Sequence, residues 1–260
     1  MAKKEAEKFV ASDIMEGMIS VRAVIRGNES GVNDRKIEKI IYDESRAKAK
    51  AKELSYLRAM GYKYGFPVEA QDAKCIEELA LGTSHGGILA LCSKRNLPAA
   101  DADGIAENGF YVMLEGIEDP YNFGYCLRSL YAAGVCGVIL ERRNWTGVSG
   151  IVARASAGAS EMFDMRISDD FAATAAIFKE KGYKFAVADK NEKSKCIYDL
   201  SLKFPLLLAV GGERRGNTKA ALDMADEIIS LDYGREFSAA LSAASAATVA
   251  AFEIFRQNRK

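Results

Sequence analysis

Residues 114–140 read LEGIEDPYNFGYCLRSLYAAGVCGVIL and predict a loop, one amphipathic helix and a buried strand. Asp119 and Pro120 interrupt regular structure, and Asn122 is a residue type favoured at a helix N-cap. Core-facing positions then recur at helical spacing through Phe123, Leu127, Leu130, Tyr131 and Gly134. The stretch therefore indicates one strand-connecting unit of an α/β protein.

Arg128 lies off this apolar stripe. Helical side chains lean toward the N-terminus, so Arg128 is expected to point back over Gly124 toward the loop that holds Asn122. A helix N-terminus with free N–H groups and a nearby cation suits a phosphate or another anion. The alternative is purely structural, with Asn122 as a cap, Gly124 as a packing point and Arg128 as a surface cation.

Composition and charge restrict the class of protein. The chain has 260 residues, and its 36 basic and 36 acidic residues cancel. A nucleic-acid partner would therefore have to be held by local basic patches. The length allows one large domain or two smaller ones, and we expect two.

Cysteine and histidine usage exclude several kinds of site. The five cysteines include no C-x-x-C pair, which predicts a reduced cytoplasmic protein without a zinc or other metal site. The single histidine, His85, excludes Ser-His-Asp and multi-histidine metal sites in the second half of the chain. The N-terminus has no apolar h-region, and no apolar run is long enough to span a bilayer, so we expect no membrane association.

Residues 14–97 predict a small α/β domain with a basic surface. A helix is expected over 44–60, and it is crowded with cations and close to Tyr56, Tyr62 and Tyr64. Cations beside aromatic rings can hold phosphates and stack on bases, which predicts an RNA-binding patch. Its predicted residues are Arg46, Lys48, Lys50, Lys52, Arg58 and Lys63. The alternative is a solvated helix face.

Residues 98–108 have the Pro, Gly, Ala and Asp composition of a linker. From 109 to 260 strands and helices alternate, which predicts a parallel sheet covered on both faces, with ligands at the carboxyl ends of its strands. The apolar run 205–210 is typical of a central strand. We therefore expect a second domain at 109–260 that carries the functional site.

The loop after that run has two interpretations. Gly211, Gly212, Glu213 and Gly216 can bring backbone close to a ligand at the sheet edge. The same segment fits a degenerate phosphate-binding P-loop, but Asn217 replaces the lysine that neutralises the β- and γ-phosphates. A nucleotide-binding protein thus remains a remote alternative.

Several motifs in order resemble the SpoU (TrmH-like) RNA ribose 2′-O-methyltransferases of the SPOUT superfamily. Residues 118–134 resemble the first motif, D-P-x-N-x-G-x-x-x-R, and 152–161, VARASAGASE, are similar to the segment that follows it. Gly211, Glu213 and Gly216 fit the second motif, G-x-E-x-x-G, and the terminal helix resembles the third. The N-terminal unit resembles the small RNA-recognition domain often fused ahead of this catalytic domain.

The resemblance implies a deep trefoil knot in the C-terminal domain, S-adenosylmethionine as cofactor and a homodimer that buries the terminal helix. It implies cofactor contacts from loop backbone at Val210, Gly211, Gly212, Gly216, Leu231, Ala240 and Leu241. It also implies catalytic roles for Asn122, Arg128 and Glu213. One departure is clear: the family's S-L-N-V-S motif has lost its Asn, which becomes Ser242 in one register and Ala240 in the other.

The implied function is methylation of a ribose 2′-oxygen in structured RNA, with ribosomal RNA favoured over transfer RNA. A guanidinium stays protonated, so Arg128 suits binding of the target phosphate and stabilisation of alkoxide charge better than the role of a base, although both remain open. The missing Asn keeps a second hypothesis open, a catalytically weakened member that binds RNA. The presence of the fused N-terminal domain, rather than any single residue, favours ribosomal RNA, and no residue indicates which nucleotide is methylated.

Overall fold

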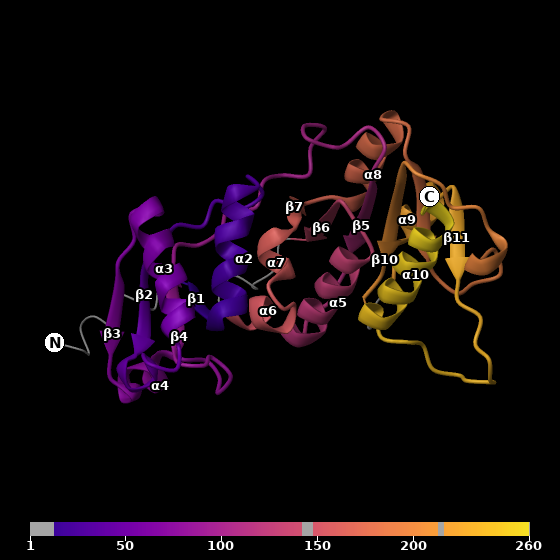
Figure 1. The fold of residues 1–260 in the computed structure, drawn as a ribbon. Coiled ribbons are helices and arrows are strands. Elements are labelled where there is room, and N and C mark those ends of the chain that lie inside the picture. Colours follow the sequence, from indigo (N-terminus) through magenta and orange to yellow (C-terminus); the bar gives the residue numbers. More distant parts are fainter. Residues whose placement is uncertain (1–12, 142–147, 213–215, 260) are drawn as a thin grey trace. The chain divides into compact units, whose positions relative to one another are not determined.

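The computed structural model describes residues 13–141, 148–212 and 216–259, and they form two compact units (Figure 1). Unit 1 comprises residues 13–96 and 148–162, and unit 2 comprises residues 97–141 and 163–259. Unit 2 holds the predicted cofactor loops, and unit 1 holds the predicted basic patch.

Unit 1 is built on a four-stranded sheet with the order β1-β4-β2-β3. The pairs β1/β4 and β2/β4 are antiparallel, and β2/β3 is parallel. Its elements are β1 (Asp13–Glu16), α2 (Gly17–Glu29), β2 (Ile37–Asp43), η1 (Glu44–Arg46), α3 (Ala51–Tyr64), β3 (Val68–Gln71), α4 (Ala73–Leu79), β4 (Ile88–Cys92), α6 (Ser149–Ala155) and α7 (Ala159–Met162).

Helices cover both faces of this sheet. On one face, α2 and α3 bury Val24, Ile25 and Leu57 against Ile40 and Ile88. On the other face, Ile76 of α4 packs on the alternating strand residues Ile41, Leu89 and Leu91. The period-two alternation of β2 and β4 thus produces two apolar faces, and α3 and α4 end up on opposite sides of the sheet.

Buried ion pairs attach α6 and α7 to the strands of unit 1. Arg35 Nε lies 2.8 Å from Glu161 Oε2, and the same guanidinium pairs with Asp13. Arg154 Nη1 lies 2.8 Å from Glu16 Oε2. The expected domain at 109–260 is therefore interrupted, because residues 148–162 pack with unit 1. The sequence pattern missed this because these charges pair across 126 and 138 residues of chain.

Unit 2 contains a seven-stranded sheet with the order β7-β6-β5-β10-β8-β11-β9, in which every neighbouring pair is parallel. This confirms the predicted α/β class. Its elements are β5 (Phe110–Leu114), α5 (Pro120–Ala132), β6 (Gly137–Glu141), β7 (Asp164–Ser168), α8 (Phe171–Glu180), β8 (Lys184–Ala188), β9 (Lys195–Cys196), η3 (Ile197–Asp199), β10 (Leu206–Val210), α9 (Lys219–Met224), β11 (Glu227–Ser230) and α10 (Ala243–Asn258).

Two helix pairs cover this sheet. Phe178 of α8 and Ala221 of α9 pack on Tyr111, Phe185 and Leu207, which point to one face of the strands. On the other side α10 packs on β10 and lies beside α5 (Figure 1). The carboxyl ends of β10, β8 and β11 are thereby left at an edge that loops, rather than helices, cover.

Some expected boundaries are wrong for local reasons. The helix expected over 44–60 begins only at Ala51, because the Asp43 carboxylate accepts from the Ser45 N–H and starts a 3₁₀ turn instead. It continues to Tyr64 and ends where Gly65 adopts a φ of 80°.

The segment predicted as a linker is packed into unit 2. Ala100 and Ile105 are buried in its core, and the Ala100 N–H donates to the carbonyl oxygen of Ile167 at 2.7 Å.

No helix in the described part of the chain is long and apolar enough to cross a membrane. The deep knot implied by the resemblance stays a prediction.

Candidate functional site

A pocket of about 660 Å³ opens at the carboxyl edge of β8, β10 and β11. The end of the loop before α10 and the first half of that helix close one side, at Ala240, Leu241, Ser242, Ala243, Ala246 and Ala250. All seven residues predicted to contact a cofactor line this pocket: Val210, Gly211, Gly212, Gly216, Leu231, Ala240 and Leu241. The structure therefore brings together two loops and a helix start that lie far apart in the sequence.

Close backbone packing explains the glycines of the loop after β10. A Cβ on Gly211 would lie 2.3 Å from the carbonyl carbon of Gly216, and a Cβ on Gly212 would lie 2.8 Å from the carbonyl oxygens of Glu115 and Gly116. Gly216 instead has open space around it and a φ of 62°. Gly211 and Gly212 are therefore required by loop-on-loop contact, and Gly216 by its backbone conformation.

Six polar residues that were not predicted as cofactor contacts also line the pocket. They are Asp189, Lys190, Asn217, Ser230, Tyr233 and Ser242. The signal that could have found Asp189 and Lys190 is their position directly after the buried strand β8.

Asn217 provides a test of whether this pocket fits a ligand. Its amide Nδ2 donates to the carbonyl oxygen of Ala188 at 2.6 Å, which fixes the orientation of the carboxamide. Its Oδ1 is buried and has no hydrogen-bond partner among the described residues. An orphaned acceptor at an apolar, glycine-lined pocket fits a ligand that carries N–H or O–H donors, as S-adenosylmethionine does.

Ser242 and Ala240, the two positions that correspond to the missing Asn in the two registers, both line the pocket, and neither carries a carboxamide. Ser242 also has a structural contact. Its Oγ accepts from the Ser245 N–H at 3.2 Å and so caps α10. A serine at this position thus has a structural role at the pocket wall while lacking the carboxamide.

Helix α5 carries two of the three predicted catalytic residues, and neither lines the pocket. Asp119, not Asn122, is the N-cap: its carboxylate accepts from the Asn122 N–H at 2.8 Å. The helix N-terminus expected to hold an external anion is therefore capped by the chain's own carboxylate. Asn122 is half-buried in the first turn, and Glu213 lies outside the described residues.

Arg128 is exposed on α5 and forms no hydrogen bond or ion pair with the described residues. It shares the outer stripe of the helix with Tyr121 and Tyr125, which are also exposed. The loop that leads into α5 touches the pocket loop through the contact of Gly116 with Gly212. Arg128 is thus an exposed cation without a partner among the described residues, and it lies on the helix that follows this loop contact.

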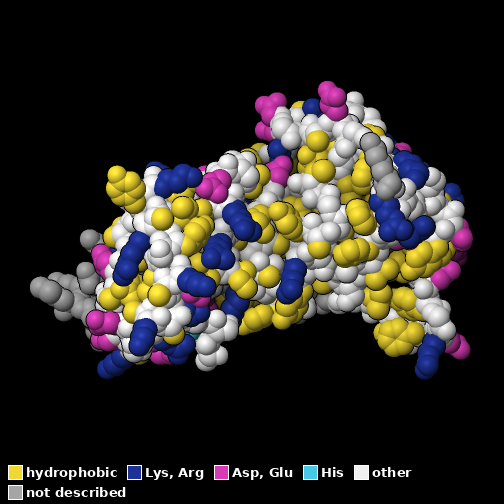
Figure 2. Space-filling model, in the orientation of Figure 1, with side chains coloured by type: hydrophobic (Ala, Val, Ile, Leu, Met, Phe, Trp, Pro, Cys, Tyr) yellow, Lys and Arg dark blue, Asp and Glu magenta, His cyan; other side chains and the backbone are white. Residues whose placement is uncertain are grey.

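The basic patch of unit 1 contains both paired and unpaired cations. Arg46 pairs with Asp43 and Lys50 with Glu53, while Lys63 pairs with Glu29. Arg58 donates a hydrogen bond to the Tyr42 hydroxyl. Lys48 and Lys52 are exposed and have no partner among the described residues. Figure 2 shows Lys and Arg side chains spread over the viewed face of unit 1.

Hydrogen bonds within this patch fix its edge. Bonding to Tyr64 and to Glu29 raises the pKa of Lys63, so Lys63 stays cationic but is largely neutralised by its partner. Tyr62 beside it is 96% exposed. Helix α2 adds two cations that the sequence analysis missed, Arg26 and Arg22, the latter 4.9 Å from the centre of the Tyr56 ring.

Comparison with known proteins places residues 109–252 in the SpoU rRNA Methylase family, whose sequence model matches this range. The chain is 30% identical over 200 residues to the 23S rRNA (guanosine-2′-O-)-methyltransferase RlmB of Shewanella oneidensis. The aligned region covers 75% of this chain and 80% of that protein. It is 26% identical over 245 residues to YacO of Bacillus subtilis, described as a putative TrmH family tRNA/rRNA methyltransferase, with 92% of this chain and 95% of that protein covered.

Solved structures share the fold. An AdoMet-bound rRNA methyltransferase from Sinorhizobium meliloti superposes with a TM-score of 0.77 at 18% identity and covers 98% of this chain and 91% of that chain. The SpoU methyltransferase AviRb from Streptomyces viridochromogenes, in complex with AdoMet, gives a TM-score of 0.73 at 19% identity, with 95% and 90% covered.

Proposed function

Because the chain belongs to the SpoU rRNA methylase family, we propose that it methylates a ribose 2′-oxygen of ribosomal RNA, with S-adenosylmethionine as the methyl donor. The observation that carries this proposal is the pocket in which all seven expected cofactor-contacting residues meet. The pocket is largely apolar, and it contains one buried acceptor, Asn217 Oδ1, that has no hydrogen-bond partner among the described residues. These features suit a ligand that combines an adenosine with a polar amino-acid end.

When bound, S-adenosylmethionine supplies a methyl group that is already activated on a sulfonium. The chain must then align the ribose 2′-oxygen with that methyl group, leave the 2′-hydroxyl proton free to pass to water, and stabilise the negative charge that develops on the oxygen. We assign charge stabilisation and binding of the target phosphate to Arg128, because its guanidinium is exposed and unpaired in the described chain. Asn122 orients the ribose. Glu213 orders the loop that binds the cofactor, or orients an arginine.

RNA docks on the basic surface of unit 1. Lys48 and Lys52 carry most of the phosphate contact, because the other predicted cations Arg46, Lys50 and Lys63 are already paired with carboxylates. An unpaired cation releases more counterions on binding than one already paired, so these two lysines contribute most to the salt dependence.

The protein forms a homodimer through unit 2. Helices α5 and α10 pack on each other and expose Tyr121, Tyr125, Val249, Phe252 and Phe255 on their outer surfaces. An apolar and aromatic surface of this kind is typical of a subunit interface. A second copy would cover it and bring the outer stripe of α5 into a shared site.

The five free thiols support a cytoplasmic location.

Two measurements test the proposal. Calorimetry should show that S-adenosylmethionine binds, and tritiated donor should label bulk ribosomal RNA more than transfer RNA. Donor binding without transfer to any RNA would favour the alternative that the chain is a catalytically weakened RNA-binding protein, which the loss of the third-motif Asn motivates. Tight ATP binding without donor binding would favour the nucleotide-binding alternative. The structure argues against that alternative. Asn217 stands where a P-loop has its lysine, and its side chain is hydrogen-bonded to the Ala188 carbonyl oxygen, so this position supplies no cation for a phosphate.

A further inference from the structure

The two charged side chains that line the pocket among the described residues follow directly after β8. Asp189 and Lys190 are adjacent in sequence and have opposite charges. Neither forms an ion pair with the described part of the chain. One unpaired anion and one unpaired cation at the same pocket edge favour a ligand group that also carries both signs.

Lys190 has a defined place at the pocket wall. Its Nζ lies 5.6 Å from the centre of the Tyr233 ring. The Tyr233 hydroxyl accepts from the Leu241 N–H at 3.1 Å, which fixes the ring against the start of α10. The ring therefore holds the ammonium group of Lys190 beside the pocket through a cation–π contact.

Asp189 is held on the same wall by Asn217. The Asn217 Nδ2 lies 3.5 Å from Asp189 Oδ2 in addition to its bond to Ala188. This arrangement leaves Asn217 Oδ1 as a buried acceptor without a partner in the described chain. A ligand ammonium group has three N–H donors and could satisfy both oxygens.

We propose that Asp189 and Lys190 recognise the zwitterionic amino-acid end of S-adenosylmethionine, Asp189 its ammonium group and Lys190 its carboxylate. Asn217 Oδ1 is the second acceptor for the ammonium group. The adenosine then occupies the apolar part of the pocket lined by Val210, Ile229 and Leu231. This inference rests on the proposed function, because it identifies the groups that would select the methyl donor.

Adenosine ligands with and without the amino-acid end test the assignment. S-Adenosylmethionine and S-adenosylhomocysteine carry the amino and carboxyl groups, and 5′-methylthioadenosine retains the adenosine without them. In calorimetry, Lys190→Met and Asp189→Asn should weaken binding of the first two about tenfold and leave 5′-methylthioadenosine within about twofold. Lys190→Arg keeps the charge and should retain affinity for all three.

Lys193→Met is the matched control, because Lys193 is exposed in the same loop and does not line the pocket. It should bind all three ligands like the wild type. Equal loss of all three ligands in Lys190→Met, or loss of none, would overturn the assignment. Failure of the wild type to bind S-adenosylmethionine would instead contradict the proposed function itself, so the two failures are distinguishable.

Discussion

The Asn217 carboxamide donates a 2.6 Å hydrogen bond to the carbonyl oxygen of Ala188 and so ties the loop after β10 to the end of β8. This bond joins the two loops that supply three of the six polar residues in the pocket lining, Asp189, Lys190 and Asn217. It also explains why an amide, rather than an apolar residue, is accommodated directly after Gly216.

Asn217→Leu should weaken S-adenosylmethionine binding about tenfold and lower the melting temperature, because the Ala188 carbonyl is left unpaired and the acceptor is removed. Calorimetry and thermal unfolding measure the two effects. Asn217→Asp, which has no N–H for Ala188, should be impaired similarly. Wild-type affinity in both variants would mean that the carboxamide has no part in the pocket.

Gly212→Ala and Gly216→Ala should differ in their effects. The added methyl at Gly212 would meet two carbonyl oxygens at 2.8 Å, so the loop must move and donor binding should fall sharply. The methyl at Gly216 meets open space and costs only about 1 kcal/mol through its positive φ. Thermal unfolding and donor titration of both variants would check this order, and a larger binding defect at Gly216 would reverse our interpretation.

Arg128→Ala should abolish methyl transfer while donor affinity stays within a few-fold and stability is unchanged. The reason is that Arg128 is exposed, does not line the pocket and forms no bond with the described residues that its removal would break. Transfer assays, calorimetry and thermal unfolding separate these effects, with the exposed Lys181→Ala as control. Parallel loss of stability and donor binding would show instead that Arg128 is structural.

The double reversal Lys48→Glu and Lys52→Glu should weaken RNA binding and reduce the slope of log affinity against log salt by roughly 0.7–0.9 for each phosphate that a lysine no longer neutralises. Donor binding should not change. The matched control is Lys74→Glu, because Lys74 is 85% exposed on α4, on the other face of the same sheet. An unchanged salt slope in the double variant would identify the patch as a solvated surface.

Glu253→Gln should destabilise the protein at neutral pH by about 1 kcal/mol. Hydrogen bonds from Arg256 and Gln257 lower the pKa of Glu253, and Gln257 in turn accepts from the Leu202 N–H. A lowered folded-state pKa gives stability above the ordinary value of 4.5 that is lost as the pH falls through the lowered one. The two proteins should therefore converge in acid, as denaturant unfolding across pH would measure, whereas Glu180→Gln should match wild type throughout.

The sequence predicted those features that depend on local patterns. The apolar run at 205–210 located the central strand β10, and the motif residues identified the loops of the pocket. The N-cap of α5 was wrong because Asn122 and Asp119 are both good capping residues, and only the structure shows that the Asp119 carboxylate receives the N–H.

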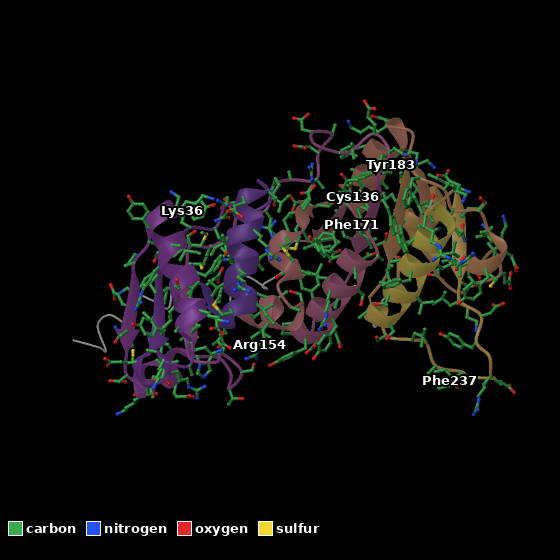
Figure 3. All side chains as sticks on the ribbon, viewed as in Figure 1. Lys36, Cys136, Arg154, Phe171, Tyr183 and Phe237 are labelled. Carbon is green, nitrogen blue, oxygen red and sulfur yellow. The ribbon has the colours of Figure 1, made fainter. Side chains whose placement is uncertain are left out.

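Features that depend on long-range contacts could not be predicted. The attachment of α6 and α7 to unit 1 depends on Glu16 and Arg35 meeting partners more than a hundred residues away. Asp189 and Lys190 carry no motif. Their position directly after a buried strand is a weak local signal, and only the placement of β8 beside β10 and β11 in the sheet shows that they share a pocket with the loop after β10. Phe237, labelled in Figure 3 on the extended loop between β11 and α10, likewise had no sequence signal that distinguished it.

The most direct test of the central claim is to incubate the wild-type protein with tritiated S-adenosylmethionine and ribosomal RNA and to map the label by alkaline hydrolysis. A 2′-O-methyl group blocks cleavage of the adjacent phosphodiester. We expect the label in an alkali-resistant dinucleotide from one position, with none in the Arg128→Ala reaction. Label that is released as an ordinary mononucleotide, or no donor-dependent labelling at all, would contradict ribose methylation.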